Sequence, residues 1–312
     1  MNINFSTGHG SYRMHPFRVL PRPLRLLSQR ARCPEVVPHH GVSRAVPLFI
    51  GAIVVLAAGP ARATPRPLPF SYPYETLPQG GLEVEQYVDL VPMRVVREGD
   101  AGSDAVTSVR SNLETEIEYG ITDHVEASWY FVFRQGASAS TPAMRFMGVK
   151  QRVRFRFGET EDLPVDMGLY LEVAEFYDEL EFEQKLLLSK RLGPVTLVSN
   201  LWVEQEYYFQ DQEWRYLYNP TLGASYQVMP SLFLGLEYWI RGSFEAGEES
   251  TDDDDGDDAG PVHYAGPTAM VQSENGFASL GAYLRWDELG QGAKPDDPWG
   301  KVWVRVLFGV DL

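Results

Sequence analysis

The chain has little cysteine, few basic residues for its acidity and no long hydrophobic run. A single cysteine among 312 residues excludes a disulfide scaffold. The formal net charge of −16 disfavours a nucleic-acid binder, because affinity for phosphates depends on Lys and Arg. No apolar run approaches the ~20 residues that a membrane-spanning helix needs. Zinc-ligand spacings, phosphate loops and nucleotide-binding motifs are also missing from the sequence.

The first 63 residues differ in composition from the rest. They hold eight of the 27 basic residues and one of the 43 acidic residues, which leaves a charge of about −23 downstream. Residues 45–58 are a 14-residue apolar run, and Ala61-Arg62-Ala63 follows shortly after. A basic region, a short apolar run and an A-x-A end are typical of a secretory signal, so we expect residues 1–63 to be removed after Ala63. Met14 is an alternative start of translation, and Cys33 would be lost with the leader.

Downstream of the leader, apolar and polar residues alternate in twelve runs. A period of two predicts β-strands whose two faces have different surroundings. Pro92 ends the first run, and Gly266 and Pro267 interrupt the tenth. The expected strands are residues 82–91, 109–119, 125–133, 146–157, 165–174, 180–188, 195–209, 213–228, 232–241, 262–272, 277–286 and 299–312.

The connections between these runs alternate in length. Brief links rich in Gly, Pro or Asn, such as 120–124 and 229–231, alternate with longer ones such as 134–145 and 242–261. The link near 177–179 is the exception, because it is short although it falls where a long loop is expected. The pattern predicts an all-β protein, an antiparallel transmembrane β-barrel of about 12 strands with short periplasmic turns and longer extracellular loops.

The choice between a barrel in a membrane and one in water depends on which face is wet. Several runs exceed ten residues, whereas soluble strands average about 5 to 6. The chain also ends inside a strand, which suits recognition by the barrel-assembly machinery. A secreted β-sandwich or jelly roll is the soluble alternative. Aromatic residues lie at strand ends, as in the interfacial girdles of membrane barrels: Trp129, Trp214, Tyr216, Tyr218, Tyr238, Trp286 and Trp299.

A family resemblance rests on four stretches: LETEIEYGITDHVEASWYF (113–131), ELEFEQKLLLSKRLGPVTLVSNLWVEQE (179–206), LGASYQVMPSLFLGLEYW (222–239) and HYAGPTAM (263–270). This set resembles an uncharacterised family of Gram-negative outer-membrane β-barrel proteins. It is more distantly similar to the barrels of the MetA pathway of phenol degradation, which share the Gly-Ile-Thr-Asp turn. The chain departs from the pattern at Leu312, where such barrels usually place Phe, and in its acidic loop. The resemblance implies fold and location and carries over no activity.

Charged residues on one face of several strands are the candidate lumen lining. One interpretation is a constriction that selects solutes by charge, and the other is a salt-bridged plug whose walls neutralise each other. Barrels of about eight strands are filled by side chains and those of 16 to 18 strands are open, so twelve permits both. The candidates are Glu114, Glu116, Glu118, Lys150, Arg152, Arg154, Arg156, Asp166, Glu172, Glu181 and Glu183.

The acidic loop 245–260 contains nine carboxylates and no basic residue. Aligning Gly256 with the glycine of a calcium loop puts Val262 at the twelfth position, where a bidentate Glu is required, so we expect a hydrated loop and no defined metal site. Among the histidines, His124 falls in a predicted periplasmic turn, and His263 is the one candidate at the outer rim for a protease-type site. We therefore expect no enzymatic activity, no catalytic residues and no cofactor.

The sequence as a whole predicts a passive outer-membrane channel or transporter for small solutes of unknown identity. A closed barrel that serves envelope integrity or surface interaction is the alternative. Residues 64–80 would be a periplasmic N-terminal segment and residues 81–312 the barrel domain. The expected partners are outer-membrane lipid and lipopolysaccharide, the barrel-assembly machinery through the C-terminal strand, and no nucleic acid.

Overall fold

The computed structural model describes residues 64–96, 105–138, 143–157, 164–244, 261–287, 289–290, 294, 297 and 299–312. The predicted leader, residues 1–63, and the whole of the acidic loop at 245–260 lie outside these ranges. Among the described residues, no helix has both the length and the apolar character needed to cross a membrane.

Thirteen strands make up one antiparallel sheet. Their bounds are β1 Leu82–Val95, β2 Val106–Thr122, β3 Val125–Gln135, β4 Arg145–Phe157, β5 Asp166–Phe176, β6 Glu179–Leu192, β7 Val195–Tyr208, β8 Glu213–Tyr218, β9 Thr221–Met229, β10 Leu232–Ser243, β11 Val262–Ser273, β12 Gly276–Arg285 and β13 Val302–Asp311.

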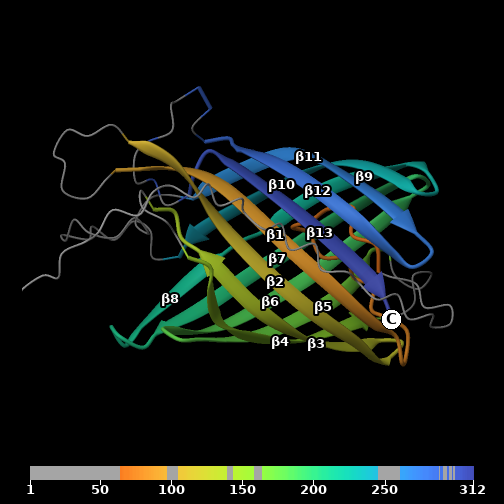
Figure 1. The fold of residues 1–312 in the computed structure, drawn as a ribbon. Coiled ribbons are helices and arrows are strands. Elements are labelled where there is room, and N and C mark those ends of the chain that lie inside the picture. The colour runs from red at the N-terminus through yellow and green to blue at the C-terminus, as the bar shows by residue number, and fades with distance from the viewer. Residues whose placement is uncertain are drawn as a thin grey trace, which may run out of the picture. The chain divides into compact units, whose positions relative to one another are not determined.

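The sheet closes on itself, because β1 pairs with β13 as well as with β2 (Figure 1). β8 and β9 share one place in the wall, since β7 and β10 each pair with both of them. The fold is therefore a closed antiparallel barrel of twelve strands, as the sequence predicts.

Proline accounts for the main differences between expected and observed strands. The run 213–228 is interrupted at Asn219 and Pro220, where the missing N–H of proline breaks the ladder. β1, in contrast, continues through Pro92 to Val95. Its ladder with β13 ends at Leu90, so beyond that point only the side facing β2 needs hydrogen bonds.

The two faces of the wall have opposite characters. Large apolar side chains point outward, and Trp129, Leu201 and Leu236 are 50%, 53% and 68% exposed. Charged side chains point inward, and Arg152 and Arg154 are each 1% exposed. This reverses the arrangement of a soluble protein and is that of a transmembrane β-barrel.

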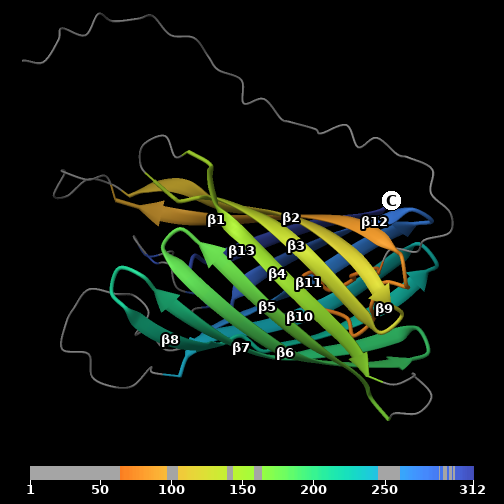
Figure 2. The ribbon, with the colours of Figure 1, turned by 90° about the horizontal axis from the view of Figure 1, so that it is seen from below.

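The connections define two ends of the barrel (Figures 1 and 2). The turn end carries the β2–β3, β6–β7, β9–β10 and β11–β12 links, each with two residues between the strands. The C-terminus lies at this end. The end of β4 and the start of β5 also lie at the turn end, with eight residues between them. The loop end carries the remaining links, which are mostly longer than two residues, although only Tyr177 and Asp178 separate β5 from β6. This is the predicted alternation.

Residues 64–80 differ from the expectation of a separate periplasmic segment. Most of them lie inside the barrel, where Leu68, Phe70, Tyr72 and Leu77 are buried, and the last three residues before Gly81 are exposed. Their backbone N–H groups donate to side chains of several wall strands. We call residues 64–80 the N-terminal segment.

Candidate functional site

The N-terminal segment enters the lumen from the turn end, reaches its deepest point near residues 70–72 and returns. Its backbone forms hydrogen bonds that a β-ladder would otherwise provide. The N–H of Ser71 donates to Oε1 of Glu237 on β10 at 2.6 Å, and the N–H of Tyr72 donates to Oδ1 of Asn200 on β7 at 2.7 Å. On the return path, the N–H of Leu77 donates to Oε2 of Glu126 on β3 at 2.8 Å. Three strands from different sides of the wall thus hold the segment.

Small residues in the wall make room for the segment. A Cβ added to Gly223 on β9 would lie 2.6 Å from Cδ1 of Leu68. A Cβ added to Gly120 on β2 would lie 2.1 Å from the carbonyl oxygen of Pro78. Both glycines are therefore positions of close approach between wall and segment.

This close approach makes a first prediction. We expect Gly120→Ala to displace the segment near Pro78, because neither backbone can accept a contact of that length. Chymotrypsin should then cleave the folded mature chain after Phe70 or Tyr74, which mass spectrometry detects. The matched control is Gly136→Ala, whose added Cβ meets nothing within 4 Å. Equal resistance of both variants to the protease would contradict the close seating of the segment.

A layer of ion pairs surrounds the segment. Nη1 of Arg66 lies 3.0 Å from Oε2 of Glu85, and it also contacts the hydroxyl of Tyr87. The Tyr87 hydroxyl donates to Oε2 of Glu116 at 2.7 Å. Burial opposes the charge of Arg66, but the oxygens of Tyr87 and Glu85 outweigh this, and the pKa of the guanidinium is raised above its ordinary value.

Arg152 and Arg154 of β4 neutralise acids on the two preceding strands. Nη2 of Arg152 lies 3.0 Å from both Oε1 of Glu116 and Oε1 of Glu118, and it contacts Glu126. Nη2 of Arg154 lies 2.8 Å from Oε2 of Glu126. Removing one partner from such a buried group leaves the other charges buried without their counter-charge. This lowers the free energy of unfolding by about 3–5 kcal/mol.

The strand register explains how β4 reaches β2 across β3. Ser128 of β3 stands between Glu118 and Arg152, because it is the cross-strand partner of both. Its side chain is short, so the guanidinium passes over it to the carboxylate. Alternation along each strand thus supplies the charges, and a small residue at the middle position allows them to meet.

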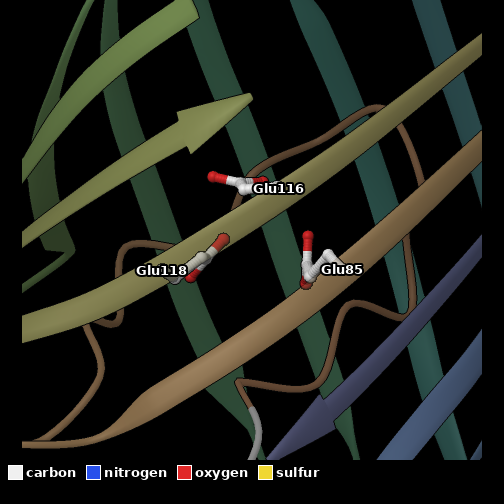
Figure 3. A group of neighbouring side chains, drawn as sticks. All are labelled: Glu85, Glu116 and Glu118. Atoms are coloured by element: carbon white, nitrogen blue, oxygen red, sulfur yellow. The ribbon is translucent and has the colours of Figure 1, made fainter. Parts of the chain in front are cut away.

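Two groups of carboxylates have the spacing of a metal site. In Figure 3, Glu85 of β1 and Glu116 and Glu118 of β2 project from neighbouring strands, and their ligand oxygens lie within 4.8 Å of one another. Arginines bind this group, because Arg66 pairs with Glu85 and Arg152 pairs with the other two. The acids are therefore neutralised by side chains of the protein itself.

The second group, Glu181, Glu204 and Glu206, has the same spacing. Arg241 of β10 lies beside it, with Nη1 3.2 Å from Oε2 of Glu204 and Nη2 2.9 Å from Oε1 of Glu206. Here too a guanidinium takes the place that a cation would fill.

A cavity of about 520 Å³, which we call the vestibule, lies between the N-terminal segment and the loop end. Phe70 and Tyr72 form its floor, and Trp299 and Trp303 are among the aromatic residues of its wall. Its charged lining comprises eight acidic and five basic residues. The vestibule is thus an acidic compartment with aromatic walls.

The structure places all eleven predicted lining residues on the lumen side, in three environments. Glu116, Glu118, Arg152 and Arg154 belong to the buried ion-pair layer. Arg156 and Asp166 lie toward the turn end, where their charges act on Glu75 of the N-terminal segment. The remaining five of the eleven predicted residues line the vestibule: Glu114, Lys150, Glu172, Glu181 and Glu183.

Sequence reasoning missed several residues of this site. Arg66 and Glu85 carry no signal of their own, because their pairing depends on the segment entering the lumen. Asp89 and Arg305 pair across β1 and β13, with Nη2 2.6 Å from Oδ2, so their contact requires barrel closure. Glu126 alternates correctly with the apolar residues of β3, and that period could have identified it.

One of the predicted girdle aromatics lies inside the barrel. Trp299 was expected in an outer girdle, but it lines the vestibule, because β13 begins only at Val302. Trp129, Trp214, Tyr216 and Trp286 are exposed. The ring of His263, considered for a protease-type site, contacts Tyr238, with Nδ1 2.6 Å from the phenol oxygen.

Comparison with solved structures shows the fold. An outer membrane channel from Pseudomonas putida F1 matches with a TM-score of 0.54 and 13% identity, over 77% of this chain and 98% of that chain. The NanC porin has a TM-score of 0.46 at 8% identity, over 74% of this chain and 98% of its own. The translocator domain of the autotransporter NalP from Neisseria meningitidis has a TM-score of 0.44 at 11% identity, over 74% of this chain and 88% of that domain. No family model and no curated protein sequence matches the chain.

Proposed function

We propose that the mature chain is an outer-membrane barrel that admits small cationic or uncharged solutes through the vestibule. The observation that supports this most is the vestibule itself, a cavity of about 520 Å³ with three more acidic than basic lining residues. Low-dielectric walls strengthen the field of those charges, which raises the local concentration of cations and lowers that of anions.

The proposal includes the location of the protein in the outer membrane. A leader that ends in Ala61-Arg62-Ala63 would export the chain. The apolar outer wall would contact outer-membrane lipid, and the acidic loop would lie among lipopolysaccharide. β13, at the C-terminal end of the chain, would present the strand by which the assembly machinery recognises it. With this orientation the turn end faces the periplasm and the loop end faces outside.

Conductance of the mature chain, residues 64–312, in a planar lipid bilayer tests the proposal. We expect discrete current steps, and under a KCl gradient a reversal potential that reports preference for potassium over chloride. Equal permeability of the two ions would contradict the charge argument. The fold of the inserted protein is checked by its heat-modifiable migration on gels.

A matched pair of variants assigns the preference to the vestibule. We expect Glu204→Gln with Glu206→Gln to weaken or reverse the preference for potassium, because the change leaves Arg241 without its two carboxylate partners. The control is Glu213→Gln, which removes an exposed acid at the start of β8. If the control shifts the reversal potential as much as the double variant, the selectivity does not originate in the vestibule.

A second candidate is a closed barrel with a structural role, and the buried ion-pair layer together with the N-terminal segment favours it. These features occupy the turn half of the lumen, on the far side of the vestibule floor. Silence in the bilayer from correctly folded protein would support this function in place of the first.

A further inference from the structure

A buried acid of β1, Glu83, lies beside the start of the N-terminal segment and forms no ion pair with a basic side chain in the part of the chain that the structure describes. Glu83 of β1 points into the lumen and is 0% exposed. Its cross-strand partners are Asp311 on β13 and Glu118 on β2, so both neighbours are also acids. Within the described ranges, no Lys, Arg or His side chain pairs with Glu83, and Arg66 binds the next inward acid, Glu85.

One backbone group contacts this carboxylate. The N–H of Thr64 donates to Oε2 of Glu83 at 3.0 Å. The other oxygen, Oε1, is buried without a hydrogen-bond partner in the part of the chain that the structure describes. It also fits closely against β13, because a Cβ on Gly309 would lie 2.5 Å from it. A buried carboxylate with one neutral donor is strongly unfavourable, so a positive group is expected beside it.

We propose that proteolytic removal of residues 1–63 converts the amide nitrogen of Thr64 into an α-ammonium group that binds Glu83 and fastens the N-terminal segment inside the barrel. Ala61-Arg62-Ala63 supplies the cleavage signal immediately before Thr64. The signal peptidase that cleaves leaders during export would use one water molecule to hydrolyse the bond between Ala63 and Thr64. The products are a carboxylate on Ala63 and an amine on Thr64, and the amine takes up a proton.

The new terminus supplies what the amide lacks. The amide has one N–H and no charge, whereas an ammonium has three N–H donors and a full positive charge. The additional donors would be available to the unsatisfied Oε1, which belongs to the same carboxylate that Thr64 N already contacts. Charge-assisted hydrogen bonds are about twice as strong as neutral ones. Processing thus locks the segment in the lumen, and the uncut chain has a weaker attachment at the same place.

The other charges near the new terminus are mostly negative. They hold the ammonium in its protonated form, so its pKa should lie above the ordinary value of about 7.7–8.0. The charged groups around Glu83 are Glu85 on the same strand, Asp311 on β13, Glu118 on β2, Glu126 on β3 and Arg66 on the segment itself.

The first measurement is the intact mass of the protein purified from outer membranes. We expect the mass of residues 64–312. A mature chain that begins at another residue would overturn the proposal, because its terminal amine would not lie at Glu83.

The second measurement is competitive acetylation of the mature chain with trace acetic anhydride across a pH series. The N-terminal peptide is then quantified by mass spectrometry and compared with that of the unfolded chain. Burial alone would slow the labelling and shift the midpoint of the pH profile downward, because desolvation disfavours the charged amine, whereas an ion pair shifts the midpoint upward. We expect an upward shift of about one unit or more, which lowers the fraction of free amine at pH 8 about fivefold.

Variants separate the ion pair from a structural effect. Glu83→Gln should lower the midpoint toward the ordinary value, and Glu114→Gln, an acid of the vestibule, should leave it raised. If Glu83→Gln does not fold, residues 63–312 provide the second test, because the retained Ala63 moves the amine by ~3.8 Å. An unchanged midpoint in Glu83→Gln, or an equally raised one in residues 63–312, would overturn the proposal.

Discussion

Deletion of the N-terminal segment should increase the conductance of the barrel several-fold. Residues 64–80 lie across the lumen between the vestibule and the turn end, and Phe70 and Tyr72 form the vestibule floor. Without them, Glu237, Asn200 and Glu126 lose their backbone partners and are hydrated by water that enters the lumen. The measurement is single-channel current of residues 81–312 beside residues 64–312, in the same lipid and salt. Equal conductance of the two chains would show that the segment does not obstruct the path.

A disulfide cross-link provides the reversible control for that deletion. Oγ of Ser71 lies 2.8 Å from Oγ1 of Thr221 on β9, so cysteines at these two positions are near enough to form a bond. The predicted mature chain has no cysteine of its own. If conduction requires the segment to move, the oxidised double variant should be silent, and a reducing agent should restore its current. Full conductance of the oxidised protein would mean that solutes pass a segment that stays in place.

The strands and their faces were predictable because each depends on local sequence. A period of two describes β2 and β4 wherever they lie in space, and lipid on one side keeps the pattern regular. The effect of a proline on its strand did not follow from local sequence. Pro220 interrupts a strand, whereas Pro92 does not, because β13 no longer pairs with β1 at that point. Only the closed register distinguishes the two cases.

The N-terminal segment was not predictable in the same way. It has no ladder, and its backbone is satisfied by wall side chains far away in sequence, such as Glu237 for Ser71. A weak signal does exist, because Phe70, Tyr72 and Tyr74 alternate with smaller residues and suggest an extended chain with a buried side. The complementary signal is small residues on inward wall positions, such as Gly120 and Gly223. Neither is interpretable without knowing which residues face one another.

The two interpretations of the charged face each describe part of the lumen. The alternating charges are compatible with both an open constriction and a salt-bridged plug. The structure has a neutralised layer around Arg152 and Arg154 and, beyond it, a vestibule where Glu181 and Glu183 line open space. Charge pattern alone could not divide these regions, because both have the same alternation along their strands.

Loss of the Arg152 charge should destabilise the barrel more than any other single substitution in the wall. Its guanidinium contacts three buried acids, Glu116, Glu118 and Glu126, and Arg152→Met would leave those charges without it in a low-dielectric space. We expect the free energy of unfolding to fall by about 3–5 kcal/mol. Urea unfolding in lipid vesicles, followed by tryptophan fluorescence, measures the change. The matched control is Arg191→Met, an exposed arginine at the turn end, for which a loss below about 1 kcal/mol is expected.

A second substitution tests whether stranded charge is the cause of that loss. Adding Glu118→Gln to Arg152→Met removes one of the abandoned carboxylates, so the double variant should be more stable than Arg152→Met alone. Lost packing of the long arginine side chain predicts the opposite order, because the second change would then add its own cost. The sign of the coupling between the two positions therefore distinguishes an electrostatic layer that holds the wall together from a layer that merely fills it.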